Sequence, residues 1–380
     1  MIKKAVPVLL LLAMLISSGC WDWRIIDELA VIFGLGIDMV EEEPEQFEIT
    51  FINPIFEEEA EEIRDITTIR GYSLAHALIN LQHQRQQQPV LGKVDVLVFA
   101  EAAAQNGAMH QILRQYDQIR DKNPTAWICI ISGATARDVI NLSPPQQPRS
   151  AVFLANILTQ NFTEGRIPEI NAIDYWINYS TGGITPVIPI IELTGPEEEQ
   201  SGILVAGLAI IDEDGRMKGY LSDTETFIYM LLTDNIQRGR FHTRVDYGDQ
   251  ENRILTGFVQ SNVAGVQSRI VQDKAVINIK MDITLTGLNV DLLLDSHLKE
   301  EVFRELEQAL ARDFQGNILK VLKKSQECEA DFVGLGQHVR IQHPQWFRGK
   351  DWPRAFGQSE INVEVNVTIK RLGSLLNPNY

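Results

Sequence analysis

The pattern of hydrophobic and polar positions is clearest in the last third of the chain. Apolar and polar residues alternate over residues 275–287, where the apolar side chains give one nearly continuous face. Residues 361–371 alternate in the same way, which is typical of a strand in a sheet with one covered face. Between them, apolar residues recur at helical spacing from about residue 296 to residue 324. The pattern predicts a strand, a long helix and a final strand.

In the first 195 residues, short strand patterns alternate with helix patterns. Ser73 precedes one helix pattern and is expected to be its N-cap. The alternation predicts a mixed sheet with helices packed against it. Strands are expected at 29–37, 47–52, 93–100, 126–131 and 186–193, and helices from 73 and at 102–120, 134–141, 152–160 and 169–179.

The clearest linker signal is TGPEEEQSG at 194–202, where Gly, Pro and a charge run occur together, and we place the main domain boundary there. Beyond it, we expect strands at 203–211 and 254–260 and a helix at 222–237. A softer boundary is placed near residue 268. The predicted fold class is α+β, with mixed or antiparallel sheets packed with helices. The expected domains are 20–195, a small middle module at 203–268 and a C-terminal module at 269–380.

The first nineteen residues have the layout of a secretory signal peptide: Lys3 and Lys4, an apolar run, and a cluster of small residues. The apolar run is shorter than the roughly twenty residues that a membrane-spanning helix needs. Its end, Gly19-Cys20, resembles the lipobox of bacterial lipoproteins, in which a diacylglyceryl group is attached to the cysteine sulfur and the signal is cut before it. We therefore expect Cys20 to be the lipidated first residue of the mature chain; a free or disulfide-bonded Cys20 in an ordinary secreted protein is the alternative.

Composition excludes some partners. The formal net charge is −17, and such a surface repels phosphate backbones, so we do not expect nucleic-acid binding. The other two cysteines, Cys129 and Cys328, lack CxxC spacing or a nearby histidine, so buried thiols are expected, although a disulfide between them stays open.

Motifs that would indicate an enzyme or a cofactor site are incomplete. Gly34-Leu35-Gly36 and Gly334-Leu335-Gly336 each lack the third glycine of a dinucleotide fingerprint, which is replaced by Met39 and Val339. Ser73 lacks the second glycine of a nucleophile elbow, and no histidines have the HExxH spacing. We predict a non-enzymatic protein with no catalytic residues, no cofactor and no metal.

A basic and aromatic cluster, HPQWFRGKDWPRAF at 343–356, has two interpretations. Its tryptophans could fill the C-terminal core while the basic residues balance local acids. Alternatively, Trp346, Arg348, Trp352 and Arg354 could form a surface for a partner protein.

The segment CWDWRIIDELAVIFGLGID at 20–38 resembles the mature start of the Ger(x)C lipoproteins, the C subunits of nutrient germinant receptors of spore-forming bacteria. The fit includes the cysteine, the following Trp-Asp, and the closing Gly-x-Gly-Ile-Asp. Trp23 and Ile25 depart from the family pattern, where a basic and an acidic residue are usual. Segments at 98–107, 127–140, 207–232 and 331–356 also resemble the family, in the same order.

The resemblance implies a three-domain α/β lipoprotein on the outer face of the spore's inner membrane. It would work beside a polytopic A subunit and a transmembrane B subunit, and would be needed for nutrient-triggered germination. The family pattern contains no catalytic residues. The main alternative is a solute-binding lipoprotein that delivers a nutrient to a transporter, a class that typically has two similar lobes; an extracytoplasmic hydrolase is the third possibility.

Overall fold

The computed structural model describes residues 28–40, 42–43, 45–54, 64–144, 149–195, 202–233, 236, 239–247, 250–289 and 300–372. The predicted signal peptide and residues Cys20, Trp23 and Ile25 lie outside this set, as does the predicted start of the long helix at residue 296.

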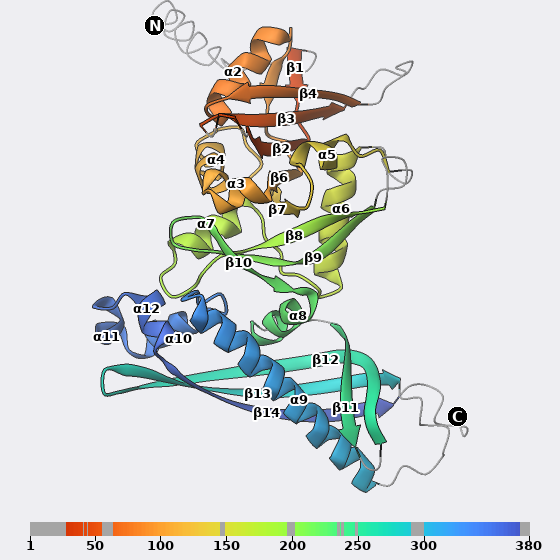
Figure 1. Cartoon of the computed structure of the whole chain (residues 1–380), viewed down its shortest axis with the longest axis vertical. Coiled ribbons are helices and arrows are strands. Elements are labelled where there is room, and N and C mark those ends of the chain that lie inside the picture. Colours follow the sequence, from red (N-terminus) through yellow and green to blue (C-terminus); the bar gives the residue numbers. More distant parts are fainter. Residues whose placement is uncertain are drawn as a thin grey trace, which may run out of the picture.

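An eight-stranded mixed sheet forms one half of the molecule (Figure 1), in the order β10-β9-β8-β7-β6-β2-β3-β4. Its middle strands are parallel: β2 (Gly34–Met39), β6 (Val96–Ala100), β7 (Trp127–Ser132) and β8 (Val187–Thr194). Antiparallel strands extend it on both sides: β3 (Phe47–Pro54), β4 (Arg64–Gly71), β9 (Gly202–Ile211) and β10 (Met217–Ser222). β6 is buried along its whole length, which explains its unbroken apolar sequence VLVFA.

Helices connect and cover these strands: α2 (Leu74–Gln84), α3 (Glu101–Gln105), α4 (Ala108–Asp117), α5 (Ala136–Asn141), α6 (Ser150–Thr163) and α7 (Ala172–Ser180). A two-stranded parallel sheet of β1 (Leu29–Val31) and β5 (Gln88–Val90) lies at the end of the molecule near α2 (Figure 1). As predicted, Ser73 is the N-cap of α2, because its hydroxyl accepts the backbone N–H of His76.

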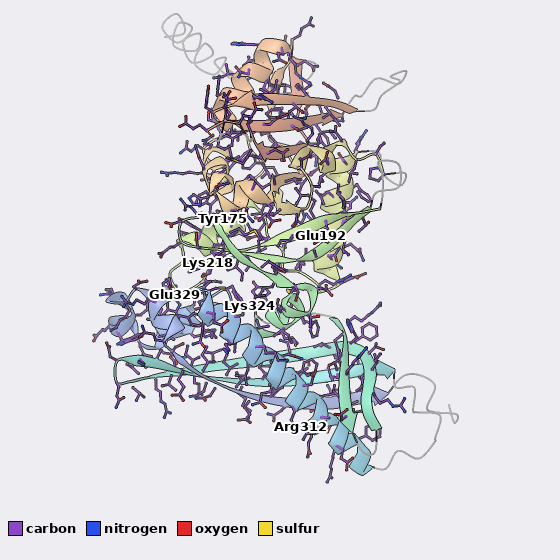
Figure 2. The ribbon with its side chains drawn as sticks, viewed as in Figure 1. Tyr175, Glu192, Lys218, Arg312, Lys324 and Glu329 are labelled. Atoms are coloured by element: carbon purple, nitrogen blue, oxygen red, sulfur yellow. The ribbon has the colours of Figure 1, made fainter. Side chains whose placement is uncertain are left out.

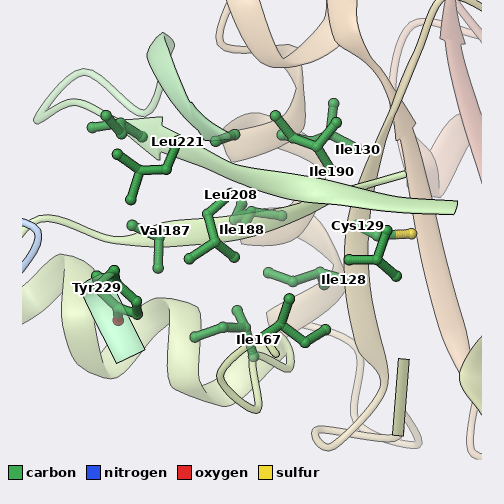
Figure 3. Close-up of a cluster of buried hydrophobic side chains, with 14 of the residues drawn as sticks. Ile128, Cys129, Ile130, Ile167, Val187, Ile188, Ile190, Leu208, Leu221 and Tyr229 are labelled. Carbon is green, nitrogen blue, oxygen red and sulfur yellow. The ribbon is translucent and has the colours of Figure 1, made fainter. Parts of the chain in front are cut away.

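The core of this half includes elements from both sides of the predicted linker. Figure 3 shows Ile128 and Ile130 of β7 with Ile188 and Ile190 of β8 and Leu208 of β9, all buried. Tyr229 from α8 (Asp223–Leu232) closes the same cluster.

The predicted boundary at 194–202 connects two strands of one sheet. β8 and β9 pair antiparallel from Val187↔Ile210 to Thr194↔Gly202, and β10 adds to β9. The other predicted boundary, near residue 268, falls inside a continuous strand. A run of Gly, Pro and charged residues indicates a turn or loop in the chain. Such a loop can join two paired strands of one sheet as well as two domains. Division into three domains stays a prediction.

The other half is a four-stranded sheet in the order β11-β12-β13-β14: β11 (Arg240–Tyr247), β12 (Gln250–Val271), β13 (Lys274–Asn289) and β14 (Glu360–Leu372). The first three strands are antiparallel, whereas β14 is parallel to β13. The predicted long helix is α9 (Glu300–Glu327), which packs on this sheet through Leu306, Leu310, Phe314, Ile318 and Leu322. Three short helices follow it: α10 (Leu335–Gln342), α11 (Pro344–Arg348) and α12 (Trp352–Gly357). The predicted α+β, multi-domain fold class is confirmed.

Side chains of α9 also satisfy the outer backbone of the edge strand β14. The amide of Gln315 donates to the carbonyl of Val363 at 2.7 Å, and the N–H of Ile369 donates to Glu307 at 2.8 Å. Edge strands leave such groups open for pairing with another chain, so these contacts reduce that risk.

Among the residues that the structure describes, no helix has both the length and the apolar character needed to cross a membrane.

Candidate interaction surface and the junction between the halves

The four residues of the predicted partner surface differ in exposure. Arg348 and Arg354 are exposed and Trp346 is half-buried, but Trp352 is 6% exposed. The Trp352 ring packs against Phe347 and Phe356, with centroids 5.2 and 5.8 Å away. Trp352 therefore belongs to the core and is removed from the predicted surface.

Trp346 ties its short helix to the turn between β12 and β13. Its indole N–H donates to one carboxylate oxygen of Asp273 at 2.8 Å, and Lys350 binds the other at 2.6 Å. The hydrogen bond from Lys350, followed by the one from Trp346, holds the pKa of Asp273 below its ordinary value.

Asp331 lies fully buried where α9 meets α10, and it is the partner of Trp352. One carboxylate oxygen accepts the backbone N–H groups of Gly334 and Leu335 at 2.9 and 3.0 Å. The other accepts the N–H of Gly336 at 2.6 Å and the indole N–H of Trp352 at 2.9 Å. Burial raises the pKa of Asp331 to about 6, against the opposing effect of these four donors.

These contacts explain the Gly334-Leu335-Gly336 motif. Successive backbone N–H groups form a nest that can bind an anion. Here the anion is the protein's own Asp331 carboxylate, three residues before the first glycine. A similar role explains Asp38, whose buried carboxylate accepts the N–H groups of Ala136 and Arg137 at 2.7 and 3.0 Å and so caps α5.

The glycines at 34 and 36 allow helices to approach β2 closely. A Cβ on Gly34 would lie 2.7 Å from Cβ of Ala151 in α6, and one on Gly36 would lie 2.9 Å from the carbonyl oxygen of Ala136 in α5. The Gly-x-Gly-Ile-Asp segment therefore forms the strand β2, against which α5 and α6 pack closely, and its aspartate accepts N–H groups at the start of α5.

The Asp331 loop also joins the two halves of the molecule. The backbone N–H of Thr185, just before β8, donates to the Asp331 carbonyl at 2.8 Å. Gly183 has φ +91°, and a Cβ there would lie 2.5 Å from the carbonyl carbon of Gly336. The loop before β8 and the start of α10 thus meet backbone against backbone.

An ion pair crosses the same junction. Lys324 of α9 lies 2.8 Å from both carboxylate oxygens of Glu225, which also closes the capping box of α8 with Ser222. Figure 2 places Lys324 between the two sheets. Partial burial raises the pKa of Glu225, but the hydrogen bonds from Lys324 and Ser222 outweigh it and hold the pKa below its ordinary value.

Replacing Lys324 with methionine should destabilise the junction by about 1 kcal/mol at pH 7, since both charges are partly exposed. Because the pKa of Glu225 is lowered in the folded state, its stabilising contribution is present above pH 4.5 and is lost as the pH falls through the folded value. Urea unfolding should therefore show a smaller difference between variant and wild type at low pH. Lys323→Met is the control, because the Lys323–Glu327 pair on the same helix is exposed; an equal loss in both variants would contradict the assignment.

The remaining candidate residues are the cysteines Cys129 and Cys328. Both are free thiols; burial raises the pKa of Cys129, and Cys328 is half-buried. Within the described part of the chain, no three His, Cys, Asp or Glu side chains are grouped to hold a metal ion.

Comparisons with known proteins agree along nearly the whole chain. A family model described as "Spore germination protein N-terminal domain" matches residues 22–193, and one described as "Spore germination B3/GerAC like, C-terminal" matches residues 206–373. The two matches divide at the predicted linker, although the strands on either side of it, β8 and β9, pair in one sheet.

Individual relatives match over nearly their full lengths. Spore germination protein KC of Bacillus subtilis is 24% identical, with 100% of this chain and 98% of the relative covered. Spore germination protein B3 of the same organism is also 24% identical, with 98% of each covered. The crystal structure of the GerBC protein matches with a TM-score of 0.59 at 18% identity, over 88% of this chain and 96% of that one, and so supports the fold.

Proposed function

Since the chain belongs to the Ger(x)C family of spore germination proteins, we propose that it is the lipid-anchored C subunit of a nutrient germinant receptor. The observation that carries this proposal is the ordered pair of family matches, which together run from residue 22 to residue 373. The subunit would act without catalysis, in a complex with membrane A and B subunits at the outer face of the spore's inner membrane.

The proposed anchor is a diacylglyceryl group on Cys20. Gly19-Cys20 supports it, together with the short apolar run before it. Two acyl chains hold a protein on a bilayer far better than one, so no spanning helix is needed. The alternative of a solute-binding lipoprotein with two similar lobes gains no support, because the two sheets differ in strand number and order.

Replacing Cys20 with alanine should abolish labelling by a palmitate analogue and release the chain from the membrane fraction, because the attachment atom is lost. Nutrient-triggered germination should fall toward that of a deletion strain. Cys328→Ala is the control, since its thiol is half-buried and far along the chain. Equal labelling of the Cys20 variant and the wild type would refute the anchor.

The subunit assignment has a separate test. Affinity purification of the full chain from spores in mild detergent should recover two membrane proteins of the A and B types. Recovery of transporter components in their place would favour the solute-binding alternative.

A further inference from the structure

The position of the proposed anchor decides which end of the molecule faces the bilayer. Cys20 lies eight residues before Glu28, the first described residue, and eight extended residues span at most about 28 Å. The chain then enters β1, which pairs with β5 at Leu29↔Gln88, just after α2. Figure 1 shows α2 and β1 at one end of the long axis and the four-stranded sheet at the other. The bilayer would therefore lie close to α2.

The outer face of α2 is uncharged. Leu74, Ala77 and Leu81 are buried on its inner face. Outward, Tyr72 just before the helix and Ile79 within it are 56% and 52% exposed. Between Tyr72 and Gln86, the other exposed positions are Ala75, Gln82, His83, Gln84 and Gln86.

Acidic residues are missing from this part of the sequence. The chain has 51 Asp and Glu in 380 residues, so about four would be expected in any 29, yet residues 66–94 contain none. The same segment contains three cations, Arg70, Arg85 and Lys93. Acids from outside it partly balance them, since Arg85 pairs with Asp65 and Lys93 with Asp95 at 3.5 Å. The result is a nearly neutral surface on a chain of net charge −17.

We propose that this face, from Tyr72 to Gln86 with Ile79 at its centre, lies against the phospholipid bilayer that holds the lipid of Cys20; the inference rests on the proposed anchor. A strongly acidic protein is repelled by anionic headgroups, so a tethered chain meets them best through its least acidic surface. Carboxylates lie at the two ends of this face, Glu45 beside Tyr72 and Glu28 beside Gln86. Tyrosine is well suited to the interface, since its ring is apolar and its hydroxyl polar. A tether this short also raises the effective concentration to about the millimolar range, so a weak contact is enough to fix the orientation.

A fluorescent probe can test the orientation without relying on lipidation. The mature chain would carry a polyhistidine tag in place of Cys20 and be captured on phosphatidylcholine–phosphatidylglycerol vesicles that contain nickel-chelating lipid. With Cys328 replaced by serine and Cys129 buried, an Ile79→Cys variant is labelled at one site with an environment-sensitive dye. Ile341→Cys is the control, because Ile341 is 75% exposed on α10 in the other half.

The expected result is a blue shift and a rise in emission at position 79 on capture, with no change at position 341. No change at position 79, or equal changes at both positions, would overturn the proposal. A change at position 79 that occurs only when the membrane subunits are added would also overturn it, and would assign the face to a protein partner. Failure of palmitate labelling at Cys20 would instead count against the anchor, since the tagged chain does not depend on it.

Discussion

An asparagine in place of Asp331 should lower the free energy of unfolding by about 2 to 6 kcal/mol, since it leaves two buried N–H donors without an acceptor at about 1 to 3 kcal/mol each. The carboxylate accepts four N–H groups, two on each oxygen. An amide offers one oxygen, and its NH₂ group would face two donors in either orientation. Chemical denaturation at pH 7 measures the loss.

Asp273→Asn is the matched control for this substitution. Asp273 also accepts a tryptophan indole N–H, but it is solvent-exposed, so water can replace the missing acceptor. We expect only a small change in stability. Equal losses in the two variants would contradict the role given to the buried site.

The raised pKa of Asp331 gives its effect a pH signature. The folded state binds the proton up to about pH 6, whereas an unfolded aspartate releases it near 3.8. The group's contribution to stability is therefore fully present below pH 3.8 and declines as the pH rises to about 6. The difference in unfolding free energy between wild type and Asp331→Asn should change over this range, and a difference that is constant with pH would show that the carboxyl does not titrate there.

Gly183→Ala should loosen the contact between the two halves and cost about 2 to 5 kcal/mol, from left-handed backbone strain of about 1 to 2 kcal/mol and overpacking of about 1 to 3 kcal/mol. Its Cβ would lie 2.5 Å from the backbone of Gly336, and backbone cannot move aside like a flexible side chain. Thermal or denaturant unfolding measures the loss.

Gly133→Ala separates the two causes. Gly133 has a similar φ of +73°, but its Cβ would meet no atom within 4 Å. It should therefore show only the backbone strain, and the larger loss at Gly183 is the part that reports on the junction. If both variants lose the same stability, the close approach of Gly183 to Gly336 contributes nothing.

The strongest sequence patterns predicted their elements well. The alternation at 275–287 lies within β13. The apolar residues at helical spacing from about 296 to 324 correspond to α9. Both depend on many buried positions that repeat at one period, so single polar residues do not hide them.

Weaker patterns were missed where few positions are buried. β4 at Arg64–Gly71 is an edge strand in which Ile69 is the one buried large apolar side chain, and no strand was predicted there. Over residues 240–246 of β11, Phe241 and Val245 are the two buried side chains, and they alternate with exposed or half-buried polar residues. The helix predicted at 222–237 ends at Leu232, and the aromatic cluster at 343–356 gave no period from which α11 and α12 could be predicted.

The junction could not be predicted because its residues are distant in sequence. Asp331 is one of 51 acidic residues, and its indole partner is 21 positions away. The adjacent Gly334-Leu335-Gly336 lacks the third glycine of a dinucleotide fingerprint, and the motif alone does not indicate that its N–H groups bind a carboxylate of the same chain. Only tertiary structure brings Gly183 and Thr185 to the same place.

The parallel pairing of β13 and β14 has a consequence for the order of folding. Parallel strands need a crossover connection, and here it runs from Asn289 to Glu360 and includes α9 to α12. The β12–β13 hairpin joins neighbours in sequence, whereas β14 pairs only after this long connection closes, so it should be the last strand to add. A chain that ends before β14 would leave the 16 residues of β13 as a bare edge, open to pairing with another copy and to aggregation.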